Sequence, residues 1–193
     1  MAAFANWLIR GFLVTVLAAV PAMAENATSP AKERRATLDK LLGALKSAPS
    51  EEIAGPLEQQ IQQLWLTAGT PAVSLLMSRG LREMKAAAND DAIEDFSAAI
   101  TLDPTLPEAY HQRAVARFSA GDTQGAITDL QATLQREPRS FVAFETLAAI
   151  AEARKDWKGA YDAWQKVLEL DPKTPGGEER LKDLRRHALG EEA

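Results

Sequence analysis

The feature that most constrains this chain is an acid–proline pair that recurs every 34 residues. The pairs end at Pro104, Pro138 and Pro172, within the segments "LDP", "REP" and "LDP". Before each pair, apolar residues recur at intervals of three and four, which places them on one face of a helix. Because proline lacks an amide hydrogen and moves its predecessor out of the helical region, each pair ends that helix. One structural unit is therefore predicted three times.

Each unit also contains an earlier helix. In this helix a large residue is followed four positions later by a very small one, as Tyr110 is by Ala114 and Phe144 is by Ala148. The small residue lets a neighbouring helix come close. Turn-forming segments at 89–91, 121–123 and 155–157 separate the two helices. Since a single helical hairpin buries only one face, such units are expected to stack in an array.

These residues resemble the tetratricopeptide repeat, a 34-residue pattern of aromatic, Leu-Gly, Tyr, Ala, Phe and Pro positions. The matching positions are Leu76, Gly80, Ala92, Phe96, Ala99 and Pro104; Tyr110, Ala114, Ala126, Leu130 and Pro138; and Phe144, Leu147, Ala148, Ala160, Trp164, Val167 and Pro172. Glu83, Arg117 and Ala151 depart from it, because they stand where the family usually has tyrosine. The resemblance implies an all-α, right-handed α-solenoid with repeats at 73–106, 107–140 and 141–174.

The flanks are predicted to be the special ends that such arrays need. Apolar residues at helical spacing indicate a helical hairpin over 32–70, interpreted as a degenerate first repeat without the proline stop. Residues 175–193 are expected to form a capping helix and tail, with Gly176 and Gly177 as a hinge. Trp157 stands where the family commonly has tyrosine, so we expect it to pack between hairpins.

The first 24 residues have the order of a secretory signal peptide. Arg10 precedes the apolar run "GFLVTVLAAV", and the small-residue site Ala22-Met23-Ala24 follows. Cleavage is expected before Glu25, leaving a flexible stretch over 25–31. The run is about half of the roughly 20 apolar residues that a spanning helix needs, which disfavours the alternative of an uncleaved anchor. We therefore expect a periplasmic protein of a Gram-negative bacterium, with secretion as the alternative.

Composition excludes several classes of function. The chain of 193 residues has 22 basic and 27 acidic residues, a formal net charge of −5, which argues against nucleic acid or an anionic membrane as partner. It has no cysteine, so thiolate metal sites, disulfides and a cysteine nucleophile are excluded. His111 and His187 lack a catalytic setting, and a two-ligand metal site of His187 with Asp183 is disfavoured against a solvated helix face. No cofactor, metal or enzymatic activity is expected.

The resemblance implies that the first helix of each hairpin lines the concave side of the array. The residues expected to face a groove there are Met77, Leu81, Met84, Lys85, His111, Val115, Phe118, Glu145 and Glu152. Apolar side chains beside an acidic end suit a peptide with apolar anchors and a basic residue, although Lys85 and Arg117 could instead hold an acidic partner. The alternative for Met77, Leu81 and Phe118 is that flanking segments cover them as core.

The predicted function is accordingly a non-enzymatic scaffold that binds a protein or peptide in the bacterial cell envelope. Two rivals stay open, a self-association module forming a homodimer or larger homo-oligomer, and a small-molecule or lipid carrier. The family subtype that grips a C-terminal carboxylate is disfavoured, since Met77, Leu81, Gln112, Val142 and Thr146 occupy its Lys, Asn and Arg positions. Arg79 with Asp95, and Arg113 with Asp129, are predicted to pair within their hairpins; the alternative is that they face water.

Overall fold

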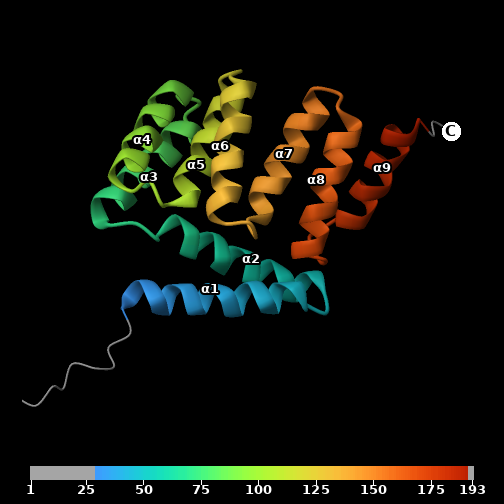
Figure 1. The fold of residues 1–193 in the computed structure, drawn as a ribbon, viewed down its shortest axis with the longest axis horizontal. Coiled ribbons are helices and arrows are strands. Elements are labelled where there is room, and N and C mark those ends of the chain that lie inside the picture. Colours follow the sequence, from blue (N-terminus) through green and yellow to red (C-terminus); the bar gives the residue numbers. More distant parts are fainter. Residues whose placement is uncertain (1–28, 191–193) are drawn as a thin grey trace, which may run out of the picture.

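The computed structural model describes residues 29–190, which contain nine α-helices and no strand (Figure 1). The helices are α1 (Pro30–Lys46), α2 (Glu51–Leu66), α3 (Pro71–Lys85), α4 (Asn89–Leu102), α5 (Pro107–Ser119), α6 (Thr123–Arg136), α7 (Phe141–Ala153), α8 (Trp157–Leu170) and α9 (Gly177–Leu189). The predicted signal peptide and most of the expected flexible stretch lie outside the described residues. Pro30 and Ala31, expected in that stretch, already belong to α1.

Helices α3 to α8 form three antiparallel hairpins that stack side by side, with α9 at the end (Figure 1). We call α3 to α8 the array. Its cores lie within and between the hairpins, around Phe96, Leu130 and Trp164, none of which exposes more than a few per cent of its surface. The prediction of an all-α solenoid of helical hairpins is confirmed.

The turn inside each hairpin repeats one backbone conformation. Ala87, Gly121 and Lys155, spaced by 34 residues, all have a positive φ, of 59°, 90° and 59°. The next amide in each turn bonds a carbonyl of the last helical turn: Ala88 to Glu83 at 2.9 Å, Asp122 to Arg117 at 2.8 Å, and Asp156 to Ala151 at 2.8 Å. A helix that ends with one residue in the left-handed conformation in this way satisfies carbonyl groups that its last turn leaves unpaired.

The acid–proline pairs form the loops between consecutive units. The carboxylates of Asp103, Glu137 and Asp171 each accept a hydrogen bond from the amide two residues later, at 3.0, 3.1 and 3.3 Å. Proline therefore ends the helix, and the acid before it holds the loop that leads to the next helix. This explains why the two residue types recur together.

Small residues permit the close helix packing inferred from the sequence. At Gly80, an added Cβ would lie 2.7 Å from the ring of Phe96 on α4. Phe96 is fully buried, and the two residues stand on the two helices of one hairpin. Glycine at position 80 is thus required by the close approach of α3 to α4.

The helices α1 and α2, which we call the N-terminal hairpin, do not stack as a first repeat. They run across the array along the edge made by the loops between units (Figure 1). Here α1 contacts α8 and α2 contacts α5. The interpretation as a degenerate first repeat is wrong, because the apolar face of this hairpin packs on the helix ends at Phe141, Val142 and Leu170 instead.

Two contacts hold the N-terminal hairpin on this edge. The rings of Trp65 on α2 and Phe141 on α7 are 5.5 Å apart. On α1, the Asp39 carboxylate accepts a hydrogen bond from Arg139 in the α6–α7 loop at 2.7 Å. Both contacts join residues far apart in sequence.

Helix α9 covers the other end of the array. Its Leu184 is buried and Leu181 half-buried against α8, and the Trp164 indole donates to the Gly177 carbonyl at 2.8 Å. Trp157 stacks on His187 of α9, with ring centroids 4.6 Å apart. Trp157 therefore packs against the capping helix. Among the described helices, none combines the length and the apolar character that crossing a membrane requires.

Candidate binding surface

The predicted groove residues on α3 lie mainly in the core. Met77 is only 1% exposed and packs with Val73 and Phe96. Leu81 and Met84 are half-buried against the same cluster, while Lys85 is exposed. The prediction that Met77 lines an open groove is wrong, because its row on α3 faces the next hairpin, where Ala109 and Ala116 of α5 close the contact.

On α5, the predicted groove residues differ in accessibility. His111 is 6% exposed; its Nδ1 donates to the Glu108 carboxylate at 3.2 Å, and its Nε2 hydrogen-bonds Thr146 Oγ1 on α7 at 3.1 Å. His111 therefore joins two repeats, and the prediction that it faces a partner is wrong. Val115 and Phe118 are half-buried, and Phe118 packs against the core between the second and third hairpins.

The acidic end of the predicted groove meets the capping helix. The Glu152 carboxylate accepts a hydrogen bond from Arg180 of α9 at 2.6 Å. Glu145 is half-buried, and burial, followed by the charge of Asp171, raises its pKa. These two acids of the third repeat thus already interact with other groups of the chain.

A cluster of carboxyl groups lies where α2 meets the array. Glu58 Oε1 and Asp171 Oδ2 are buried and have no hydrogen-bond donor among residues 29–190. Burial is the largest cause that raises the pKa of Glu58, to about 7, and the neighbouring Asp171 carboxyl group and the charge of Glu145 add to it. Burial also raises the pKa of Asp171. A proton held between Glu58 and Asp171 would supply the missing donor.

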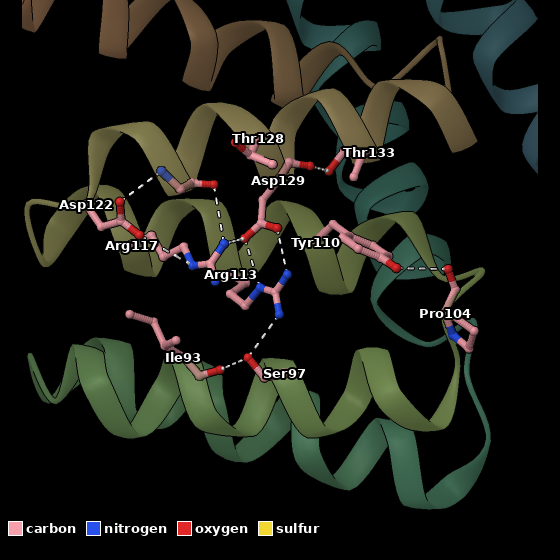
Figure 2. A network of polar contacts seen from close by, with 12 residues as sticks. Ile93, Ser97, Pro104, Tyr110, Arg113, Arg117, Asp122, Thr128, Asp129 and Thr133 are labelled. Carbon is pink, nitrogen blue, oxygen red and sulfur yellow. Dashed lines mark hydrogen bonds and ion pairs between the residues drawn. The ribbon is translucent and has the colours of Figure 1, made fainter.

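The predicted ion pairs within hairpins are present. Arg113 donates to both carboxylate oxygens of Asp129, at 2.8 and 2.7 Å, and Arg117 adds a third bond at 2.8 Å (Figure 2). Arg79 pairs with Asp95 in the same way, and its hydrogen bond lowers the pKa of Asp95. Arg113 also donates to Ser97 of the preceding hairpin at 3.0 Å, so the network joins two repeats.

The sequence analysis missed a cavity of about 460 Å³ between the N-terminal hairpin and the array. We call it the basic cavity. Its residues come from α1, the end of α2, the α4–α5 loop, the start of α5 and the end of α6: Lys32, Arg34, Arg35, Leu38, Leu64, Trp65, Thr105, Pro107 and Arg136 among them. The basic run "KERR" at 32–35 is its only sequence signal. Nothing in that run indicates that Arg136 lies beside it.

The sequence analysis weighed His187 and Asp183 as a two-ligand metal site. Among residues 29–190, no three His, Cys, Asp or Glu side chains are grouped so as to hold an ion. His187 stacks on Trp157, and Asp183 pairs with Arg186. The two residues of the considered metal site are thus engaged in other contacts.

Comparison with known proteins supports the resemblance. Residues 108–140 match the family model described as tetratricopeptide repeat. No curated protein sequence matches the chain. The first TPR of Spaghetti (RPAP3), solved with the HSP90 peptide SRMEEVD, is 23% identical with a TM-score of 0.57, covering 62% of this chain and 96% of that one.

Two further solved structures are similar. The Sgt2 TPR domain from Aspergillus fumigatus is 23% identical with a TM-score of 0.58, covering 63% of this chain and 82% of that one. MamA is 21% identical with a TM-score of 0.54, covering 86% of this chain and 91% of that one. At these identities the likeness concerns the fold, which is an all-α solenoid of the tetratricopeptide type.

Proposed function

We propose that the chain is a non-enzymatic scaffold that binds another protein through a peptide segment. The observation that carries the proposal is the array itself, in which α3 and α5 bring half-buried apolar side chains, Leu81, Val115 and Phe118, to two stacked repeats. The similar RPAP3 domain was solved with a bound peptide, which supports a peptide as the kind of partner.

Photo-crosslinking in living cells tests this function. A photo-reactive amino acid at Val115, on a first helix, is expected to yield an adduct with a different protein. Gln131 on α6 is the matched control, because it is exposed on a second helix. Equal labelling from both positions, or none from Val115, would contradict the proposal. An adduct containing only a second copy of the chain would favour the self-association module instead.

We also propose that this scaffold acts in the bacterial envelope after export. The support is the segment 1–24, which has the charge, apolar run and small-residue site of a signal peptide. Intact mass measurement of the protein recovered from its own cells is expected to show a chain that begins at Glu25. A chain that keeps residues 1–24 would refute cleavage and support an anchored form.

A further inference from the structure

The basic cavity exists only because the N-terminal hairpin lies across the edge of the array. One wall is the start of α1, the second is the end of α2, and the third is made of loop residues such as Thr105 and Glu137. Its volume of about 460 Å³ falls within the usual range of ligand pockets, roughly 300–1,000 Å³. It lies at the helix ends of the array and away from the predicted groove residues.

The charge of the cavity is opposite to that of the chain. Four of its five ionisable residues are basic: Lys32, Arg34, Arg35 and Arg136. The single acid, Glu137, is already paired, since its two carboxylate oxygens accept hydrogen bonds from Arg139 at 2.9 and 3.1 Å. In a chain of net charge −5, this is a local excess of positive charge.

The two arginines that are held in place keep their charge. Arg136 donates to the carbonyls of Pro104 and Ala132, both at 2.8 Å, and its guanidinium lies 4.1 Å from the centroid of the Tyr110 ring. Arg34 donates to the Ala68 carbonyl. Carbonyl groups and rings orient a guanidinium without neutralising it, so both cations remain able to pair with an anion.

The other two cations stand at the exposed rim. Lys32 and Arg35 are exposed on the first turns of α1. Neither makes an ion pair within residues 29–190. Long side chains without a partner can turn toward a bound anion at a small cost in side-chain entropy.

The floor of the cavity is apolar and contains one unsatisfied donor. Trp65 is only 4% exposed, and its indole N–H has no acceptor among the described residues. Buried polar groups are nearly always hydrogen-bonded, so this unpaired donor marks Trp65 as an unusual residue in the lining of the cavity. Leu38, Leu64 and Pro107 surround it with apolar surface.

We propose that the basic cavity binds an acidic peptide segment of a partner protein. Its carboxylates would pair with the cations of the rim, and an apolar side chain between them would contact Trp65 on the floor. This inference rests on the proposed scaffold function and adds the site and the chemistry of the peptide. Carboxylates fit the arginine fork bidentately, whereas nucleic acid requires a long basic face that an acidic chain with one basic cavity does not offer.

Titration followed by nuclear magnetic resonance tests the site directly. The probe is the capped peptide Ac-Glu-Glu-Leu-Glu-Glu-NH2, added to the ¹⁵N-labelled protein at about 0.1 M salt. The indole resonance of Trp65 is expected to shift and saturate. That of Trp164, which already donates to Gly177 at 2.8 Å, is expected to stay in place. The same peptide with glycine for leucine is expected to bind more weakly.

Matched charge reversals on one helix locate the binding. Lys32→Glu with Arg35→Glu is expected to weaken peptide binding by about tenfold or more, since each removes a charge-assisted contact and adds repulsion. Lys40→Glu with Lys46→Glu changes the net charge equally at exposed positions of α1 outside the cavity, and is expected to weaken it by less than about twofold. Circular dichroism verifies that both variants fold.

Four results would overturn the proposal. The first is a Trp65 indole resonance that does not move at about 1 mM peptide, and the second is equal weakening of peptide binding by the two double variants. The third is an equal shift of this resonance with the basic peptide Ac-Lys-Lys-Leu-Lys-Lys-NH2. The fourth is a shift caused by phosphatidylglycerol vesicles and not by the acidic peptide. The last result would assign the cavity to a lipid surface. Crosslinking from Val115 does not depend on this cavity, so failure here is distinguishable from failure of the scaffold function.

Discussion

Asp129 illustrates how much a single buried acid does in this array. It is 3% exposed and accepts hydrogen bonds from Arg113 and Arg117, while Arg113 also reaches Ser97 (Figure 2). One carboxylate thus pairs with two arginines and orients Arg113, the side chain that joins two hairpins. Its loss would leave two partly buried charges without their common partner.

Asp129→Ala is therefore expected to lower the free energy of unfolding by about 3 kcal/mol, because removing one partner of a buried ion pair leaves the other uncompensated. Urea denaturation measures the change. Asp162→Ala is the control, since Asp162 is half exposed and, among residues 29–190, pairs only with Lys158; a loss below about 0.5 kcal/mol is expected there. Similar losses for both variants would contradict the structural role of Asp129.

The third repeat shows what replaces this arrangement. Leu147 and Ala163 stand at the positions of Arg113 and Asp129, and they line a cavity of about 210 Å³. Both members of the predicted pair are absent together, as expected for two residues that pair within one hairpin. Residue spacing sufficed for that prediction, because the two positions lie on facing helices of one hairpin in every repeat.

The N-terminal hairpin is the element whose position has the most consequences. Glu58 on α2 lies near Asp171 and Glu145 of the array, and each of the three has a raised pKa, that of Glu58 reaching about 7. A carboxyl group with a raised pKa binds its proton more tightly in the folded state. Between pH 4.5, which is the ordinary pKa of this group, and about pH 7, Glu58 therefore binds a larger fraction of a proton in the folded chain than in the unfolded chain.

It follows that Glu58 makes the free energy of unfolding fall as the pH rises from about 4.5 to 7. Glu58→Gln, which keeps a hydrogen-bond donor beside Asp171 at any pH, is expected to raise the melting temperature at pH 8 and to change it little at pH 5. Thermal melts at both values measure this. Glu94→Gln on the exposed face of α4 is the control. If the melting temperature of Glu58→Gln differed between pH 5 and pH 8 by as much as that of the unsubstituted protein, this account would be contradicted.

At the scale of the whole molecule, the chain combines two surfaces. The array brings α3, α5 and α7 together, and the N-terminal hairpin closes a different edge and creates the basic cavity. The sequence indicated the apolar face of this hairpin, but it did not indicate the surface on which that face packs. A helical hairpin with Leu42 and Leu45 on one helix and Ile61 and Trp65 on the other can bury them against any matching surface. Here the helix ends near Phe141 supply that surface.

The sequence by itself determined the repeating hairpins, their boundaries near the acid–proline loops and the ion pairs inside them, because these depend on residues close together in the chain or related by the 34-residue period. Only the tertiary structure decided that Met77 and His111 are buried, that α1 and α2 cross the array, and that four basic residues meet around Trp65. Burial of one helix face depends on which neighbour approaches it, and local spacing carries no information about that neighbour.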